Sequence, residues 1–321
     1  MYRRIAVALD VGPEGRSALH WAVTIARRAS CPLDLLRVAV PAVHGSDLYA
    51  AAVLDTSDAE RLEREAEQGL RDIADEVASA GVRATPVVLR GNVPSALADH
   101  LRSSEADLVV MTTHDRGRLE RLLLGSVSGA VMRHAHIPAL LLRARDSGAG
   151  AYTVSDAEPE LRRILVPLDG SPFGEQILAP ATTLARVMNA SLTLLSVVEP
   201  ILATAALAAG IDGGIGAPLA AQSVNPEGEE ELVALESAAL ERMAARIRLL
   251  DLSVDTRVVV DARPAHAIVE YASRHRIDLI AMTTHGRGGL KRLVAGSVSA
   301  SVLHAADAHM LLYRPEHPAP S

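Results

Sequence analysis

A 21-residue phrase occurs twice in this chain. MTTHDRGRLERLLLGSVSGAV begins at Met111 and MTTHGRGGLKRLVAGSVSASV begins at Met282, and 14 of the 21 positions are identical. The likeness extends to other segments, because RRIAVALD from Arg3 matches RRILVPLD from Arg162. A repeat of this length indicates two copies of one domain. The 321 residues are enough for two domains that each bury a core of their own.

The spacing between matching segments places an insertion in the second copy. This spacing is 159 residues near the start of each copy and 171 residues at the repeated phrase. The extra residues fall at about 200–227, around a stretch rich in Ala and Gly. Residues 146–160 are rich in Gly, Ala, Ser and acidic residues, which is typical of a linker. We therefore predict domains at 1–145 and 161–315, joined by a linker at 146–160.

Each copy alternates short apolar runs with amphipathic segments. In the first copy, apolar runs predict strands at 5–9, 33–40, 82–89, 108–112 and 139–142. Apolar residues between Leu62 and Val77 recur at three and four positions, and they predict a surface helix that ends at Gly81. Strands that alternate with helices indicate βαβ units. The predicted fold is α/β, with two tandem doubly wound domains that each contain a five-stranded parallel sheet.

Composition argues against several classes of partner. The formal net charge is -7 and aromatic residues make up 2% of the chain. Nucleic-acid binding is not expected, because it needs a basic surface and, for single strands, aromatic side chains on which bases stack. The single cysteine, Cys31, cannot form an internal disulfide, and the chain opens on a strand pattern without a signal peptide. Both features favour the cytoplasm. The apolar stretch 201–222 contains Asp212, several glycines and Pro218, which argue against a membrane span.

The repeated phrase predicts a polar loop between a buried strand and a helix. His114 and His285 follow a strand pattern immediately, and the Gly-Ser-Val-Ser segment is expected to begin a helix. The free amides of a first helical turn and the serine hydroxyls would form an anion site, and a phosphate chain is the natural ligand. Gly-Ser is also an ordinary helix N-cap. Asp10 and Asp169, which end the first strands, could accept hydrogen bonds from a ribose or cap the next helix, and both interpretations stay open.

Together these residues resemble the universal stress protein family. The resemblance rests on an apolar strand ending in Asp, followed later by Thr-His-Gly, nine residues and Gly-Ser, and it covers both halves of the chain. It implies an adenine-nucleotide alpha-hydrolase-like sheet with the strand order 3-2-1-4-5. Many members of the family bind ATP through G-x-x-G-x9-G-[ST], whereas others lack this motif and do not bind it. The resemblance therefore implies ATP, with Mg2+, as the ligand.

Carried over to this sequence, the resemblance implies a nucleotide site in the second copy and a degenerate one in the first. The second set is Pro167, Asp169, Val197, Met282, Thr283, His285, Gly286, Gly296, Ser297, Val298 and Ser299. The weaker, first set is Asp10, Val38, Thr112, His114, Gly125, Ser126, Val127 and Ser128. Thr112 and Thr283 stand where the motif has its first glycine, and Asp115 replaces the second glycine in the first copy. Its carboxylate would repel phosphates or share a magnesium ion with them.

The expected function is that of a cytoplasmic, ATP-binding stress-response or regulatory module, and not that of an enzyme. His114 and His285 are the nearest candidates for a general base, but neither has an evident orienting partner, and slow ATP hydrolysis stays open. No metal centre is expected, because HExxH and paired cysteines are both absent from the sequence. The alternative is an interaction scaffold that binds no nucleotide. Its two sheets would pack as an intramolecular pseudo-dimer, burying the strand edges at 139–142 and 310–313, and the chain could also form a homodimer.

Overall fold

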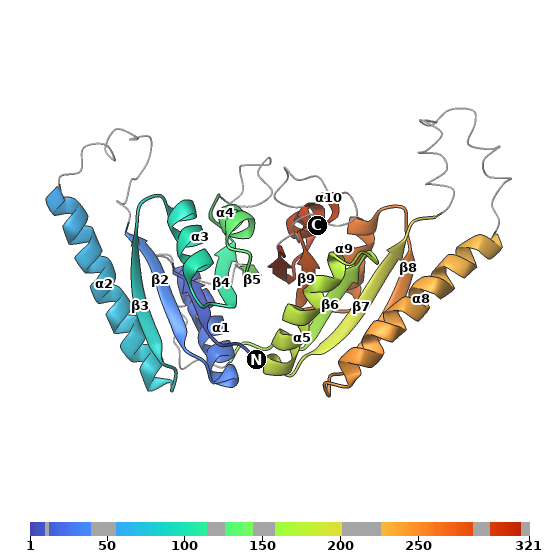
Figure 1. Ribbon diagram of the computed structural model, residues 1–321, viewed down its shortest axis with the longest axis horizontal. Helices are drawn as coiled ribbons and strands as arrows, with labels where there is room; N and C mark the ends of the chain where they lie inside the picture. The colour runs from blue at the N-terminus through green and yellow to red at the C-terminus, as the bar shows by residue number, and fades with distance from the viewer. Residues whose placement is uncertain are drawn as a thin grey trace, which may run out of the picture. The chain divides into compact units, whose positions relative to one another are not determined.

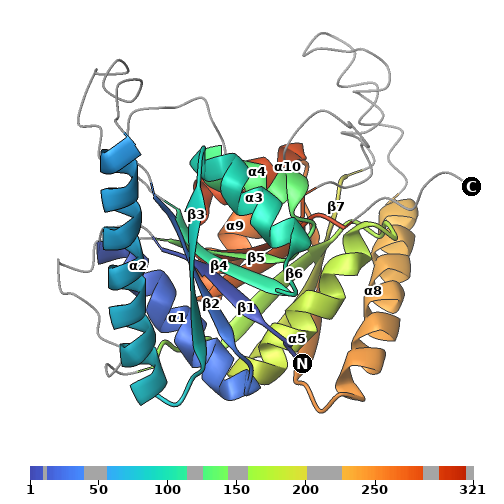
Figure 2. The same ribbon diagram turned by 60° about the vertical axis from the view of Figure 1, so that its left-hand side comes forward.

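The computed structural model describes residues 1–9, 13–39, 56–113, 126–143, 158–200, 226–284 and 296–315. Contacts divide the chain into two units. Unit 1 comprises Met1–Glu160 with His309–Ser321, and unit 2 comprises Leu161–Ala308. In each unit strands and helices alternate along the chain, as Figures 1 and 2 show.

Unit 1 contains a parallel sheet with the order expected for the family. Along the chain its elements are β1 (Ile5–Ala8), α1 (Pro13–Ala29), β2 (Leu33–Ala39), α2 (Thr56–Ser79), β3 (Ala84–Arg90), α3 (Val93–Ser103), β4 (Leu108–Thr113), α4 (Ser126–His134) and β5 (Ala139–Arg143). β1 pairs in parallel with β2 and β4, β2 pairs with β3, and β4 pairs with β5. The order is therefore β3-β2-β1-β4-β5, which confirms the predicted fold class.

The last strand of the chain, β10 (His309–Tyr313), also belongs to unit 1. It pairs with β5 in the antiparallel direction, and Leu311 lies opposite Leu140. Met310, Leu311 and Leu312 are almost fully buried. An apolar strand edge without a partner would leave its amides and carbonyls open to association with other chains. The two predicted edges at 139–142 and 310–313 instead pair with each other.

Unit 2 repeats the same winding. Its elements are β6 (Arg163–Leu168), the short 3-10 helix η2 (Gly174–Ile177), α5 (Leu178–Met188), β7 (Ser191–Val198), α8 (Pro226–Arg248), β8 (Val254–Val260), α9 (Pro264–Arg274), β9 (Leu279–Thr283) and α10 (Ser297–Ala305). β6 pairs in parallel with β7 and β9, and β7 pairs with β8. The chain thus winds from β6 to β8 on one side and returns to the other side of β6 as β9. The switch point between β6 and β9 is where such sheets bind ligands.

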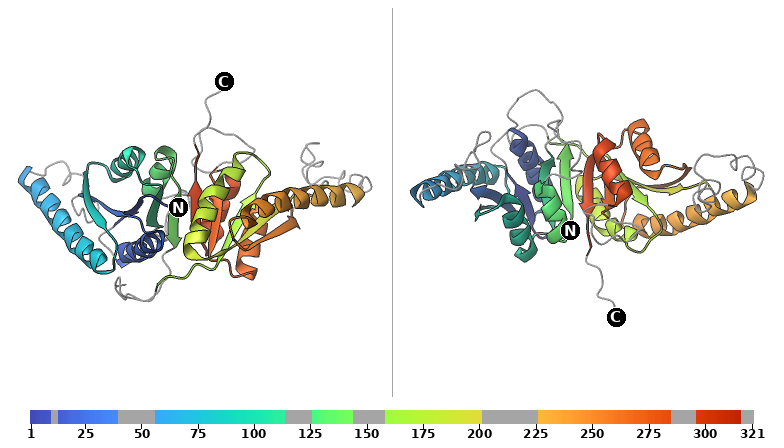
Figure 3. Two further views of the ribbon diagram at one scale, coloured as in Figure 1. Left: turned by 60° about the horizontal axis from the view of Figure 1, so that its bottom comes forward. Right: turned by 90° about the horizontal axis from the view of Figure 1, so that it is seen from above.

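The core of each unit is aliphatic. In unit 2 every residue of β9 is buried, as a strand covered on both faces requires. Figure 3 shows α5 and α8 on one face of this sheet and α9 and α10 on the other. None of the helices in the described part of the chain combines the length and the apolar character that crossing a membrane requires. The stretch 201–222 lies outside the described residues.

Candidate functional site

In unit 2 the end of β9 and the start of α10 are joined by hydrogen bonds. The Gly296 amide donates to the carbonyl oxygen of Thr284, the residue after β9. The Ser299 hydroxyl donates to the same carbonyl oxygen at 3.2 Å and to the Gly296 carbonyl oxygen at 3.1 Å. The Ala300 amide closes the first helical turn on Gly296 at 2.9 Å. The Gly-Ser segment therefore starts a helix directly beside a strand end, as the sequence predicted.

The N-terminus of α10 has the features of an anion site. Gly296 occupies the N-cap position with φ -63° and ψ 159°, and it makes no side-chain cap hydrogen bond. Any residue adopts this conformation, so the backbone does not require glycine here. The first amides of a helix have no acceptor within the helix, and the helix dipole adds positive potential at this end. For comparison, Asn92 at the start of α3 accepts a hydrogen bond from the Ser95 amide at 3.4 Å.

The two serines of this segment have different surroundings. Ser299 is 4% exposed, and its hydroxyl is already engaged by the two carbonyl oxygens. Ser297 is exposed and Val298 is half-buried. Ser297 is therefore the serine whose hydroxyl a ligand can reach. Sequence alone gave both serines the same role.

Thr283 stands where the family motif has a glycine, and its backbone is extended. It is the last residue of β9, and its side chain is 9% exposed. A β-branched residue is favoured in a strand, so threonine fits this position without a positive φ. Met282 is 7% exposed and Thr284 is fully buried. The end of β9 at the switch point is therefore buried.

Asp169 organises the turn after β6. Its Oδ1 accepts hydrogen bonds from the Ser171 amide at 3.0 Å and from the Ser171 hydroxyl at 2.6 Å. The Ser171 hydroxyl oxygen in turn accepts a hydrogen bond from the Gly174 amide at 2.9 Å. A Cβ on Gly174 would come within 2.6 Å of Asp169 Oδ1, so only glycine fits there. These hydrogen bonds form an Asx-type turn before η2, whose N-cap residue, Phe173, makes no side-chain cap hydrogen bond.

Parallel strands bring several other predicted residues to the same edge of the sheet. Pro167 lies in β6 opposite Leu195, and Val197 lies in β7 opposite Val259. Both predicted residues are half-buried. The turn at η2 packs against β9, which places the Asp169 network beside that strand. The carboxyl ends of β6, β7 and β9 therefore carry the described part of the predicted second site.

A cavity of about 510 Å³ opens beside this edge in unit 2. It is lined by Leu168, Gly170, Glu175, Glu236, Ala239, Leu240, Arg242, Met243 and Arg246. Glu236 of α8 accepts a hydrogen bond from the Ser196 hydroxyl of β7 at 3.0 Å. The volume lies in the range of small-molecule sites. The sequence did not predict these α8 residues, because they follow the insertion and carry no motif.

A second cavity of about 520 Å³ lies at the opposite edge of the unit 2 sheet. Its lining includes Arg163 at the start of β6, Ser191 at the start of β7, and His275 after α9. These residues mark the amino ends of the strands. Sheets of this kind bind their ligands at the carboxyl ends, so this cavity is not the counterpart of the predicted site.

The first copy is described only in part at its predicted site. Thr112 lies in β4 opposite Leu142 and is half-buried, and Val38 lies in β2 opposite Leu89. In α4, which begins at Ser126, Val127 is half-buried and Ser128 is 7% exposed. The other predicted residues of the first copy, Asp10, His114, Asp115 and Gly125, lie outside the described residues. The same holds for His285 and Gly286 of the second copy.

Comparisons with known proteins point to one family. A sequence profile of the universal stress protein family matches residues 1–143 and 160–314. A universal stress protein of Mycolicibacterium smegmatis is 28% identical over 315 residues, which cover 97% of each chain. Universal stress protein Rv2005c of Mycobacterium tuberculosis is 29% identical over 322 residues, covering 97% of this chain and 96% of that protein. The crystal structure of a universal stress protein from Archaeoglobus fulgidus has a TM-score of 0.65 at 17% identity, covering 97% of this chain and 96% of its own, and supports the fold.

Proposed function

Because this chain belongs to the universal stress protein family, we propose that it binds ATP with Mg2+ at the carboxyl edge of the unit 2 sheet. The first copy binds nucleotide weakly or not at all. The protein acts as a nucleotide-dependent stress-response or regulatory module in the cytoplasm. The observation that carries this proposal is the junction of β9 and α10, where Gly296 begins the helix without a side-chain cap.

The chemistry of this junction suits a phosphate chain. The first-turn amides of α10 point away from the helix toward the carboxyl edge of the sheet, where the dipole favours negative charge. The φ of -63° at Gly296 suits any residue, so its backbone conformation does not explain why glycine stands there. Without a side chain, Gly296 leaves room for a ligand to approach the backbone closely. Ser297 adds an exposed hydroxyl donor. Asp169, fixed by Ser171, lies after β6 on the other side of the switch point.

A calorimetric titration of nucleotide-stripped protein with Mg-ATP tests the proposal. We expect one site per chain. The substitution Gly296→Ala keeps the helix start, since alanine adopts the same φ and ψ, but its Cβ obstructs the close approach and removes most of the binding. Gly125→Ala makes the matched change in the first copy and leaves the stoichiometry unchanged. If Gly125→Ala removed the site and Gly296→Ala did not, the nucleotide would occupy the first copy.

We propose binding without turnover. His285 and His114 are the nearest candidates for a general base. The substitution His285→Ala would leave any slow release of phosphate from ATP unchanged if this residue only shapes the loop. A fall in that rate with unchanged affinity would instead assign it a part in hydrolysis.

The scaffold remains the second candidate, and the pairing of β10 with β5 favours it. β10 comes from the second sequence repeat and closes the edge of a strand from the first. A chain that gives no saturable heat with Mg-ATP but forms a defined homodimer in sedimentation would support the scaffold. Nucleotide binding with one site per chain would favour the regulatory module.

A further inference from the structure

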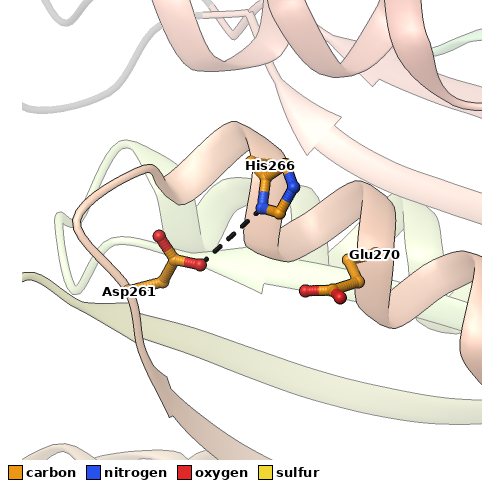
Figure 4. Close-up of side chains that lie close together, drawn as sticks. All are labelled: Asp261, His266 and Glu270. Atoms are coloured by element: carbon orange, nitrogen blue, oxygen red, sulfur yellow. Dashed lines mark ion pairs between the residues drawn. The ribbon is translucent and has the colours of Figure 1, made fainter.

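The carboxyl end of β8 carries a group of potential metal ligands that the proposed nucleotide site does not use. Asp261 follows β8 directly, and His266 and Glu270 lie one turn apart on α9. One ligand atom from each residue lies within 4.8 Å of the other two. Figure 4 shows the imidazole and the two carboxylates directed toward one another. His266 Nδ1 is 3.7 Å from Asp261 Oδ2.

The fold holds Asp261 in place for this arrangement. Its amide donates to the carbonyl oxygen of Val198, at the end of β7, at 3.0 Å. Its Oδ1 accepts a hydrogen bond from the Arg263 amide at 2.7 Å, and its Oδ2 is the oxygen that faces His266. Hydrogen bonds of this kind orient a carboxylate ligand before a metal arrives. The residues i and i+4 of a helix present their side chains on one face, which brings His266 and Glu270 together.

We propose that Asp261, His266 and Glu270 form a binding site for a divalent transition-metal ion of the Zn2+ type. An imidazole nitrogen with two carboxylate oxygens is a ligand set that zinc accepts readily, whereas Mg2+ and Ca2+ prefer oxygen ligands throughout. Three protein ligands leave a fourth position for water or another ligand. The side chains of Asp261 and His266 are 24% and 50% exposed, so the ion enters directly from solvent.

An existing ion pair competes with the metal only weakly. Glu270 Oε1 lies 2.7 Å from Arg274 on the next turn of α9. The Arg274 side chain is 71% exposed, and exposed pairs at this spacing contribute little stability. A divalent ion between two carboxylates neutralises more charge than this arginine does. Glu270 therefore exchanges Arg274 for the metal at small cost.

The sequence repeat supplies an internal comparison. α3 and α9 can be aligned on a proline at the start of each helix, Pro94 in α3 and Pro264 in α9. By this alignment, Gly91, Ala96 and His100 occupy the positions of Asp261, His266 and Glu270. The first copy thus lacks the ligand set. One ion per chain is expected, bound by unit 2.

The test is a calorimetric titration of the full chain, freed of metal and nucleotide, with Zn2+ and separately with Mg2+. We expect one Zn2+ per chain, and we expect Mg2+ to bind far more weakly. His266→Ala and Asp261→Asn each weaken Zn2+ binding by about 10-fold or more, because the loss of even an outer-shell partner of a ligand costs about 10- to 100-fold in affinity. Asn keeps the acceptor for the Arg263 amide, so the turn is retained. The control is His304→Ala, which removes an exposed histidine of α10 in the same unit.

Two outcomes overturn this site. If Zn2+ binds the wild-type and His266→Ala proteins with equal affinity, its ligands lie elsewhere. If Zn2+ does not saturate at one ion per chain, the protein has no defined site for it. Co2+ gives a second readout, because its visible absorption reports nitrogen and oxygen ligands directly and should change in Asp261→Asn. No nucleotide is present in these titrations, so their failure leaves the proposal of ATP binding untouched.

Discussion

The Ser299 hydroxyl lies 3.2 Å from the carbonyl oxygen of Thr284, which comes 15 residues earlier in the chain. This bond fastens the start of α10 to the end of β9. The same oxygen also accepts a hydrogen bond from the Gly296 amide, and an intramolecular hydrogen bond typically contributes about 0.5 to 1.5 kcal/mol. Two hydrogen bonds to one oxygen therefore hold the start of the helix, and one of them comes from a serine that is 4% exposed.

The two serines of this segment should respond differently to substitution. We expect Ser299→Ala to lower the stability of unit 2 by about 1 kcal/mol, because it removes one of the two hydrogen bonds to the Thr284 carbonyl oxygen. Ser297→Ala removes an exposed hydroxyl and should leave stability within about 0.5 kcal/mol of wild type while weakening Mg-ATP binding. Thermal unfolding and calorimetry separate the two effects. A loss of stability in Ser297→Ala, with none in Ser299→Ala, would reverse these roles.

Asp169 combines a structural role with a proposed ligand role, and two substitutions distinguish them. Asp169→Ala removes the acceptor of both Ser171 bonds and should cost about 1 kcal/mol or more, because each intramolecular hydrogen bond contributes about 0.5 to 1.5 kcal/mol. Asp169→Asn keeps an acceptor oxygen and should retain most of the stability. If the carboxylate binds the ribose, Asp169→Asn still weakens ATP binding. Unchanged affinity in this variant would restrict Asp169 to the turn.

Gly174 should tolerate no side chain. The Cβ of Gly174→Ala would meet Asp169 Oδ1 at 2.6 Å, so the Asp169 network must move, and the unfolding temperature should fall. Gly69→Ala is the matched control, because its Cβ would meet only the end of the Arg37 side chain, at 3.3 Å. Alanine is the better helix former inside α2 by about 0.5 to 1 kcal/mol. Equal unfolding temperatures for the two variants would contradict the crowding at Gly174.

The β10 strand should stabilise unit 1 although it ends the second sequence repeat. Removing residues 309–321 leaves the apolar edge of β5 without its partner, and we expect lower stability and concentration-dependent association. The backbone amides of Leu140 and Leu141 should exchange with deuterium faster than in wild type. Removing 316–321 alone keeps β10 and serves as the control. Slow exchange at β5 after the longer deletion would mean that β5 does not depend on this pairing.

Cys31 should react slowly in the folded protein. Burial, with a smaller effect from Asp107, raises the pKa of its thiol from 9.0 to about 11. At pH 8 the thiolate is then about 100-fold scarcer than in the unfolded chain. Because the folded state holds the proton more tightly, this group favours folding below about pH 9 and that contribution is lost as the pH rises toward 11. Reaction with a disulfide reagent at equal rates in native and denatured protein would be inconsistent with the buried thiol.

Local patterns in the sequence determined the fold class of this protein. Continuous apolar runs and three-and-four spacing are set by residues close in the chain, so they predicted the strands and helices of unit 1 and the helix start at Gly296. The repeat extended the same fold to the second half, where β6 to β9 follow the same winding. The strand order itself came from the family resemblance and was confirmed by the strand pairing.

Only the tertiary structure decided which atoms meet. In the structure the Ser299 hydroxyl donates to a buried carbonyl oxygen and Ser297 is exposed, although the sequence predicts the same role for both. Asp169 accepts a hydrogen bond from the Ser171 hydroxyl, and Asp261 lies beside His266. No sequence motif predicts either contact. The tertiary structure also paired β10 with β5. Periodicity records which face of an element is buried, whereas contacts between distant segments depend on how the packed elements place each side chain.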